Sequence, residues 1–573
     1  MRAVELTRVE PSFAFLSNSA APHPDLSAAL PPLPTHRLTM RRALLAALLA
    51  LQAAARTSVS ETYTAVVWQM TLKGQHADAS LADNVAAVMG DVRHKLALAA
   101  AGGADVVVFP EVAFWGPFAP SLGTQAARDL LSGGYTVTPV TGAVPCDEAP
   151  DGAGAGVLLV EASCAARAAG AVVVANMIHE VPCSAGTDPG CPADAKFLYN
   201  ANVVLEADGS VLFVYHKRHL FSTSPILNEP IAPPPNAPFT TSFGVTFGTF
   251  TCYDMEFTDE VAPLLAAGVE HFLFPTDWGA NNVPLYSAYQ IQQGWARTNG
   301  GTLVAANVAN VGGSGSGIFD SAGNPLAVYY DPDPATEAAD TMLTAVVAVD
   351  QAAPPPVRGA LAALDGGDGA GDLGVPCHYQ RPWYGPDYVD HRPSDVNNGR
   401  CALVDVAAPG PQTLRARQGT VVCEANVTVA DDASAAAGAP LALFAAAGNV
   451  TNPGTPDALA TQVCGLMRCT KVGLAPNARA VCRTAFSAPG ADDSPVDWWG
   501  PDGGLRGSFD ALTTAVSPYF AIGDVRLAPG GATAFTVDYQ RPGAPRVDAA
   551  LRPMYGPGEQ LPLFSAVLMA LQG

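Results

Sequence analysis

Short apolar runs alternate with amphipathic stretches over residues 63–349. One long segment, Leu81–Ala101, repeats its apolar positions at near-helical spacing and is followed by two glycines, so it predicts a helix that ends at Gly102. Ala207-Asp-Gly209 between two apolar runs is typical of a hairpin turn. The runs predicted as strands are Tyr63–Gln69, Ala104–Pro110, Ala171–Asn176, Phe197–Leu205, Val211–Tyr215, Phe247–Thr251, Glu270–Phe274, Leu303–Asn307 and Leu343–Val349.

This alternation predicts an α/β catalytic domain over residues 58–350. Residues 351–376 are rich in Pro, Gly and Ala, which is typical of a linker. Residues 377–573 combine six cysteines with short strand-like runs, and we expect a smaller β-rich domain stapled by disulfides. The length of 573 residues agrees with two to four domains.

The N-terminal region has the pattern of a targeting segment. Met40-Arg41-Arg42 is followed by the apolar run Ala43–Leu51 and an Ala-rich exit, as in a secretory signal peptide over residues 40–57. The run is too short for a membrane span, which needs roughly 20 residues. We therefore expect translation to start at Met40 and residues 1–39 to be a non-native or disordered extension. The alternative is a buried or interfacial Ala/Leu helix.

Charge and cysteine content agree with secretion. The formal net charge of −22 argues against nucleic acid and anionic membranes as partners. Ten of the eleven cysteines can pair in an oxidising compartment, which leaves one free. Cys252 is the only cysteine between Cys191 and Cys377 and is our candidate for it. Asn426 and Asn449 begin glycosylation tripeptides. The apolar run Leu561–Leu571 fits either the tail of a lipid-anchor signal or a final strand.

Three residues with complementary chemistry follow predicted strands: Glu111, Lys217 and Cys252. We expect Cys252 to be exposed at the rim of the sheet, close to a helix N-terminus that favours its thiolate. A thiolate can attack an amide carbonyl while a carboxylate transfers the proton to the leaving amine. An ammonium, together with a backbone N–H after the nucleophile, can hold the oxyanion. The set predicts that the site can cleave a stable amide without a metal.

Other interpretations use some of the same residues. A glutamate or lysine at a strand end is usually solvated. His216 and His219 suggest a Cys–His protease, but no protease nucleophile motif accompanies them. Cys464 and Cys469 lack the second ligand pair that a zinc site needs. The ordered set of Glu, Lys and Cys at three strand ends favours the amidase interpretation.

The order of FPE, YHK and GTFTCYD resembles the carbon–nitrogen hydrolase (nitrilase) superfamily, and further segments resemble its biotinidase and vanin (pantetheinase) branch. These segments are Asn176–Cys183, Tyr199–Val204, Phe274–Trp278, Gly294–Ala296, Gly315–Ile318, Val422–Glu424, Gln462–Cys469 and Leu527–Gly530. The resemblance extends over about residues 62–571. It implies that the C-terminal run is a strand.

The resemblance implies an αββα sandwich with Cys252 as nucleophile, Glu111 as general base and Lys217 as oxyanion stabiliser or proton donor. It implies secreted hydrolysis of a small linear amide without a cofactor, with pantetheine in first place and biotinyl amides as the alternative. Nitrile hydrolysis and a non-catalytic secreted binding protein are the remaining interpretations. The disulfides that it suggests are Cys146–Cys164 and Cys183–Cys191.

Two features depart from the family pattern. The superfamily usually has an orienting glutamate about seven residues after the lysine, whereas Thr223 and Ser224 occupy this region and Glu229 follows later. Asp277 places a carboxylate beside Trp278, where the branch tends to have a small residue. We therefore include Glu229, Asp277, Trp278 and Tyr253, whose N–H follows the nucleophile, among the candidate substrate-binding or oxyanion residues.

Overall fold

The computed structural model describes most of the chain from residue 61 onward. The described residues are 61–117, 122–148, 154–221, 226–278, 288–309, 315–329, 340–350, 372–379, 398–405, 408–429, 441–451, 458–471, 480–483, 496–497, 504–510, 518–519, 535–540, 546–553 and 566–572. The expected extension and signal peptide, and residues 351–371 of the expected linker, lie outside them. No helix within these ranges combines the length and the hydropathy of a membrane span.

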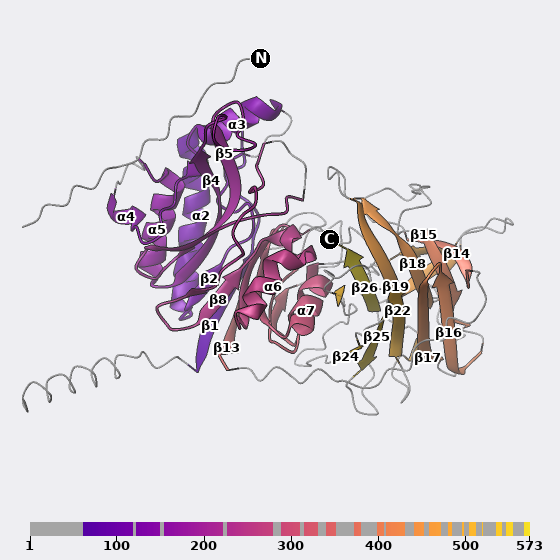
Figure 1. Ribbon diagram of the computed structural model, residues 1–573. Coiled ribbons are helices and arrows are strands. Elements are labelled where there is room, and N and C mark those ends of the chain that lie inside the picture. The colour runs from indigo at the N-terminus through magenta and orange to yellow at the C-terminus, as the bar shows by residue number, and fades with distance from the viewer. Residues whose placement is uncertain are drawn as a thin grey trace, which may run out of the picture. The chain divides into compact units, whose positions relative to one another are not determined.

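Two mixed β-sheets form the α/β part of the molecule (Figure 1). The first sheet has the order β13 (Thr341–Ala348), β1 (Thr62–Gln69), β2 (Val106–Val108), β4 (Val172–Pro182), β5 (Lys196–Leu205) and β6 (Val211–His216), and β3 (Thr136–Val137) also pairs with β4. The second has the order β12 (Pro325–Tyr329), β11 (Ser316–Phe319), β10 (Thr302–Asn307), β9 (His271–Thr276), β8 (Thr246–Thr249) and β7 (Phe239–Thr240). Parallel pairs at β1–β2–β4 and β8–β9–β10 form their centres.

Alternate residues of the central strands serve two different cores. On β1, Ala65 and Val67 pack between the sheets, whereas Val66 and Trp68 face the helices. Strand β2 divides in the same way, since Val107 belongs to the helix-facing core and its neighbours to the core between the sheets. Burial on both faces explains why these strands are continuously apolar.

Helices cover the outer face of each sheet, which gives the αββα sandwich (Figure 1). Helices α2 (Leu81–Ala101), α3 (Thr124–Ser132) and α5 (Val157–Ala169) contribute to the core outside the first sheet, and the short α4 (Pro145–Glu148) precedes α5. Helices α6 (Thr258–Ala266) and α7 (Ala288–Asn299) pack outside the second. There Trp295 of α7 contacts Phe250 and Phe272, with ring centroids 5.1 and 4.9 Å apart.

Helix α2 confirms the sequence prediction at both ends. Ser80 caps its N-terminus by accepting a hydrogen bond from the Asp83 amide, and Gly102 ends it. Strand boundaries were predicted less well, because β2 is shorter and β4 longer than the apolar runs that indicated them. The added part of β4 begins with the buried Met177 and Ile178, but His179 and Glu180 after them are polar and half-buried and interrupt the apolar pattern.

The remainder of the described chain consists of two sheets, which are antiparallel except for the parallel pair of β14 and β20 in the first of them. One contains β18 (Leu441–Thr451), β15 (Asn398–Leu403), β14 (Val375–Tyr379), β20 (Ala480–Arg483), β19 (Ala458–Lys471), β26 (Ala566–Gln572) and β23 (Pro518–Tyr519). The other contains β16 (Gly410–Gln418), β17 (Val421–Val429), β22 (Gly504–Asp510), β25 (Arg546–Pro553) and β24 (Phe535–Gln540), with β21 (Val496–Asp497) beside β17. The C-terminal apolar run thus contains a strand, β26, paired with β19 and β23.

Among the described residues, four disulfides are formed: Cys146–Cys164, Cys183–Cys191, Cys377–Cys401 and Cys423–Cys464. The last one joins β17 to β19 and so ties the two C-terminal sheets together. Asn426 lies on β17, where its side-chain oxygen accepts a hydrogen bond from Thr413. The side chain of Asn449 lies outside the described part, and glycosylation at both positions stays a prediction.

Strand register suggests how the last two cysteines are used. Cys469 of β19 lies directly opposite Cys482 of β20 in the antiparallel pair, a spacing at which a disulfide can form. We predict that the denatured, non-reduced protein titrates with one thiol and that its Cys252→Ala variant titrates with none. Three thiols in the unmodified protein would contradict this pairing.

Candidate active site

The three candidate catalytic residues lie at the ends of strands from both sheets. Glu111 follows β2 and Lys217 follows β6 directly, while Cys252 follows β8 as the first residue of the 3-10 helix η2 (Cys252–Glu256). Their relative exposures are only 5%, 2% and 4%. Because these strand ends meet at one edge of the sandwich, residues that are 141 positions apart in sequence converge.

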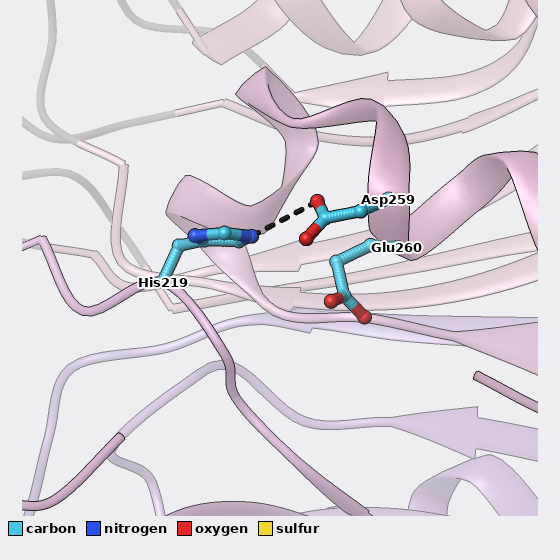
Figure 2. Close-up of side chains that lie close together, drawn as sticks. All are labelled: His219, Asp259 and Glu260. Carbon is cyan, nitrogen blue, oxygen red and sulfur yellow. Dashed lines mark hydrogen bonds and ion pairs between the residues drawn. The ribbon is translucent and has the colours of Figure 1, made fainter. Parts of the chain in front are cut away.

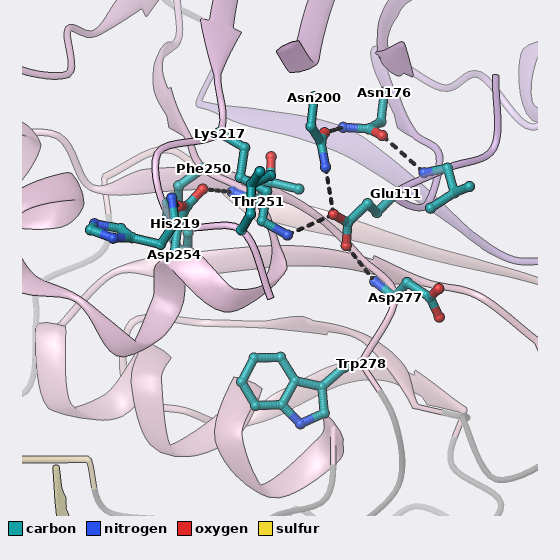
Figure 3. A network of polar contacts seen from close by, with 12 residues as sticks. Glu111, Asn176, Asn200, Lys217, His219, Phe250, Thr251, Asp254, Asp277 and Trp278 are labelled. Carbon is teal, nitrogen blue, oxygen red and sulfur yellow. Dashed lines mark hydrogen bonds and ion pairs between the residues drawn. The ribbon is translucent and has the colours of Figure 1, made fainter. Parts of the chain in front are cut away.

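Glu111 is the centre of this polar cluster (Figure 3). Its Oε1 accepts hydrogen bonds from the Lys217 ammonium and from the Asn200 amide, each at 2.7 Å. Its Oε2 accepts one from the backbone N–H of Asp277 at 3.1 Å. The carboxylate is therefore fixed by three donors, one within β5 and two that follow β6 and β9. Oε2 has the greater remaining capacity to accept a proton.

A ladder of buried asparagines orients the Glu111 region. Asn176 on β4 donates to Asn200 at 2.6 Å and to Asn202 at 3.0 Å, and its own oxygen accepts from the Val112 N–H at 2.9 Å. Asn202 donates to Thr249 on β8 at 2.9 Å, which connects the first sheet to the second. Since each amide has a defined partner, the Asn200 side chain is held with its N–H₂ group toward Glu111.

Cys252 differs from the sequence prediction in its environment. It is the free cysteine of the described residues, as expected, but it is buried and not exposed at the rim. It packs in an apolar cluster with Phe250, Tyr253 and Trp278. Burial and the Glu111 charge raise the pKa of its thiol well above the usual value, against the opposing effect of Lys217. The expected bias toward thiolate was therefore wrong, because desolvation outweighs the single turn of helix behind the sulfur.

Two backbone positions in the site are strained. Cys252 has a φ of 47° and Val112, next to Glu111, a φ of 70°. Such values are unfavourable for non-glycine residues and are typical of functional sites where the surroundings impose them. The hydrogen bond from the Val112 N–H to Asn176 is one such constraint.

Lys217 remains an ammonium in this buried position. Burial by itself would lower its pKa, but the negative charge of Glu111 raises the pKa above its ordinary value. The backbone N–H of Lys217 donates to the Asn200 carbonyl at 2.8 Å, which fixes the backbone where β6 ends. A permanently charged donor therefore lies beside Glu111 and close enough to influence the Cys252 sulfur.

Asp277 and Trp278 border this cluster through the segment after β9. Figure 3 shows the Asp277 backbone nitrogen on the Glu111 side and its carboxylate on the far side, with the Trp278 indole extending away from Glu111. Asn307 on β10 holds this segment, since its oxygen accepts from the Trp278 N–H at 2.8 Å and its nitrogen donates to the Trp278 carbonyl at 3.1 Å. The position of the Asp277 amide thus depends on Asn307.

The remaining candidates take different places. Tyr253 is buried directly after Cys252, with its ring against Phe221 and Phe257. The Glu229 carboxylate accepts from the Leu220 N–H at 2.8 Å, so it supports the backbone that follows Lys217. Thr223 and Ser224 lie outside the described residues.

A possible ligand group for a metal lies next to this cluster. Ligand atoms of His219, Asp259 and Glu260 fall within 4.8 Å of one another. Figure 2 shows the His219 ring directed at Asp259, with the Glu260 carboxylate turned away. His219 Nε2 lies 3.0 Å from Asp259 Oδ1. The two Glu260 oxygens are engaged by Arg218 at 2.9 Å and by Tyr215 at 2.8 Å. A cation here would lie beside the Arg218 guanidinium, so we assign no metal to this group.

Comparison with known proteins identifies the α/β part. The model of the carbon–nitrogen hydrolase family matches residues 52–331. This part of the chain belongs to the carbon–nitrogen hydrolase superfamily. Its curated relatives include mouse pantetheinase, 33% identical over 41% of this chain and 44% of the relative, and bovine biotinidase, 35% identical over 30% and 32%. The chain thus matches less than half the length of these relatives.

Solved structures are similar at lower identity. The Saccharomyces cerevisiae protein Nit3, of the nitrilase superfamily, is 16% identical to this chain, with a TM-score of 0.38 over 51% of this chain and 91% of Nit3. The αββα architecture described above stands on the sheet order and core packing of the chain itself.

Sequence reasoning missed the residues that hold the site together. Asn176, Asn200 and Asn202 were noted as family-like but given no role, and Asn307 was placed only within a strand. The available signal was polar amides inside strands that are otherwise apolar, because a buried amide needs partners.

The charges around Cys252 predict opposite effects on its reactivity. Glu111→Gln removes the charge that raises the thiol pKa, so the pH profile of iodoacetamide alkylation should move to lower pH. Lys217→Met removes a charge that lowers this pKa and should move the profile to higher pH. Glu161→Gln, at a partly exposed position, serves as control. Shifts of both variants in the same direction would contradict this electrostatic arrangement.

Proposed function

We propose that this protein is a secreted thiol amidohydrolase of the vanin and biotinidase type. It hydrolyses a linear secondary amide, with pantetheine as the preferred candidate, to pantothenate and cysteamine. The observation that carries the proposal is the buried contact of the Glu111 carboxylate with the Lys217 ammonium beside the unpaired Cys252. The four disulfides of the described residues agree with an extracellular or secretory-pathway location.

In the first half of the reaction, the amide carbonyl is attacked by the Cys252 sulfur. Because the thiol pKa is raised, its proton must be removed during the attack, and Glu111 Oε2 is the acceptor with free capacity. The developing oxyanion is stabilised by the Lys217 ammonium and the Tyr253 N–H. Cleavage of the C–N bond then takes the proton from Glu111 to the leaving amine and leaves the acyl group on sulfur as a thioester.

The second half reverses these roles with water as the nucleophile. Glu111, again a carboxylate, removes a proton from a water molecule that attacks the thioester carbonyl. The C–S bond breaks, the carboxylic acid leaves, and the thiolate recovers its proton from Glu111. Lys217 remains charged throughout, since its raised pKa holds the proton. No external oxidant or metal takes part in this sequence of steps.

We prefer pantetheine to biotinyl amides as the candidate substrate because segments in both parts of the chain resemble the vanin branch. Mouse pantetheinase also matches a longer stretch than bovine biotinidase, 241 against 176 residues. The Asp277 carboxylate beside Trp278 is the feature of this chain that we expect to modify the preference. A non-catalytic secreted binding protein is the second candidate, favoured by the departure from the family pattern after Lys217.

A direct assay distinguishes these functions. The purified protein is offered pantetheine, biocytin and an aliphatic nitrile while free acid is measured, and we expect turnover of pantetheine above the other two. Glu111→Gln should reduce kcat/KM about 10²–10⁴-fold, as expected for the loss of a general base, and Cys252→Ala should abolish turnover. Turnover that survives in Cys252→Ala would exclude the thiol mechanism, and no turnover of any amide would favour the binding protein.

A further inference from the structure

A second buried acidic cluster lies behind the nucleophile and is not used by the proposed reaction. The Tyr215 hydroxyl on β6 is 2.8 Å from Asp254 Oδ2 and 2.8 Å from Glu260 Oε2. The exposures of the two acids are 0% and that of Tyr215 is 4%. A hydroxyl has one proton and can donate to only one of the two carboxylates. The other short oxygen–oxygen contact requires a proton on a carboxyl group.

The hydrogen-bond partners indicate which acid holds this proton. Burial raises the pKa of Asp254. This carboxylate, however, accepts backbone N–H groups from Thr251 at 3.0 Å, His219 at 2.9 Å and Arg218 at 3.3 Å, which favour its ionised form. Glu260 has no such set of amides among its described contacts. Its burial, foremost, and the Asp254 charge raise its pKa to about 8. Glu260 therefore donates its proton to the Tyr215 oxygen, and the Tyr215 hydroxyl donates to Asp254.

Several charged groups surround Glu260 and enter this balance. The Arg218 guanidinium lies 2.9 Å from Oε1 and favours ionisation, while the neighbouring Asp259 opposes it. The groups facing this cluster from the elements packed around it are Tyr215 and Lys217 at the end of β6, Arg218 and His219 after it, Asp254 in η2, and Asp259 at the start of α6. The pKa of Glu260 is raised because its burial and the charges of Asp254 and Asp259 outweigh the opposing effects of Tyr215 and Arg218.

Asp254 links the two halves of the candidate site. Through Thr251 it binds the residue immediately before Cys252, and through Arg218 and His219 it binds the segment immediately after Lys217. Asp254 is thus one of the contacts that set the distance between the Cys252 sulfur and the Lys217 ammonium. Ionisation of Glu260 would put a second negative charge against it and leave only one proton for two contacts.

We propose that Glu260 is a positioning residue whose protonated carboxyl group fixes, through Tyr215, the Asp254 carboxylate that joins the Lys217 segment to the nucleophile turn. This arrangement makes the site sensitive to alkaline pH. Only the expected effect on the catalytic rate rests on the proposed amidase function. The expected effect on the backbone is independent of turnover.

The sign of the pH dependence follows from the direction of the shift. Glu260 has a higher pKa in the folded protein than the ordinary value of 4.5. Its contribution to stability is therefore complete below about pH 4.5 and is lost as the pH rises through about 8. Glu260→Gln stays neutral and keeps a donor for the Tyr215 oxygen, so this loss should disappear in the variant.

The test combines hydrogen exchange with kinetics between pH 7 and pH 9. In the unmodified protein, the protection of the Arg218 and His219 amides, corrected for intrinsic exchange, should fall over this interval, and in Glu260→Gln it should not. For one ionisation near pH 8, the ratio of kcat/KM at pH 9 to that at pH 7 should be about tenfold higher in Glu260→Gln than in the unmodified protein. Glu161→Gln, which makes the same change at a partly exposed glutamate paired with Arg93, is the matched control.

Each outcome decides the proposal. Tyr215→Phe breaks the link while keeping both acids, so its Arg218 and His219 amides should be poorly protected at both pH values. Equal pH dependence of protection in Glu260→Gln and the unmodified protein would overturn the proposal. Altered protection with an unchanged rate ratio would make Glu260 structural and overturn its positioning role. Absence of amide turnover in every variant would refute the proposed function, while the exchange data would still decide the role of Glu260.

Discussion

Two opposite charges, the Glu111 carboxylate and the Lys217 ammonium, lie 2.7 Å apart where water has almost no access. Burying such a pair costs several kcal/mol per ion before their attraction and further hydrogen bonds offset it. The structure supplies these bonds from Asn200 and from the Asp277 amide. Most of the buried hydrogen bonds around the candidate site satisfy this pair directly or hold its partners in place beside the thiol.

The pair also explains why the site needs both sheets. Glu111, Asn200 and Lys217 come from the first sheet, whereas Cys252 and the Asp277 amide follow strands of the second. The Asn202–Thr249 hydrogen bond and the apolar core between the sheets hold the two groups in one geometry. The raised thiol pKa is the consequence of this burial, and it makes the neighbouring carboxylate chemically necessary, because little thiolate is present before a substrate arrives.

The candidate residues at the strand ends could be predicted from the sequence, but the buried side chains that support them could not. The order of Glu111, Lys217 and Cys252 could be recognised because apolar runs mark strands and chemistry follows where they stop. Burial of Cys252 could not be foreseen, since a sequence does not show which aromatic rings will pack over a turn. The asparagine ladder and the Tyr215–Asp254–Glu260 contacts join residues that are at least 24 positions apart in sequence. Only the folded arrangement of the strands brings them together.

The covalent step can be examined directly by quenching the protein with acid during pantetheine turnover and mapping its peptides by mass spectrometry. A pantothenoyl group joined as a thioester to Cys252 is the predicted result, because the amine leaves before water attacks. An acyl group on any other residue, or product formation while Cys252 stays unmodified throughout, would contradict the assignment of Glu111, Lys217 and Cys252 as one catalytic unit.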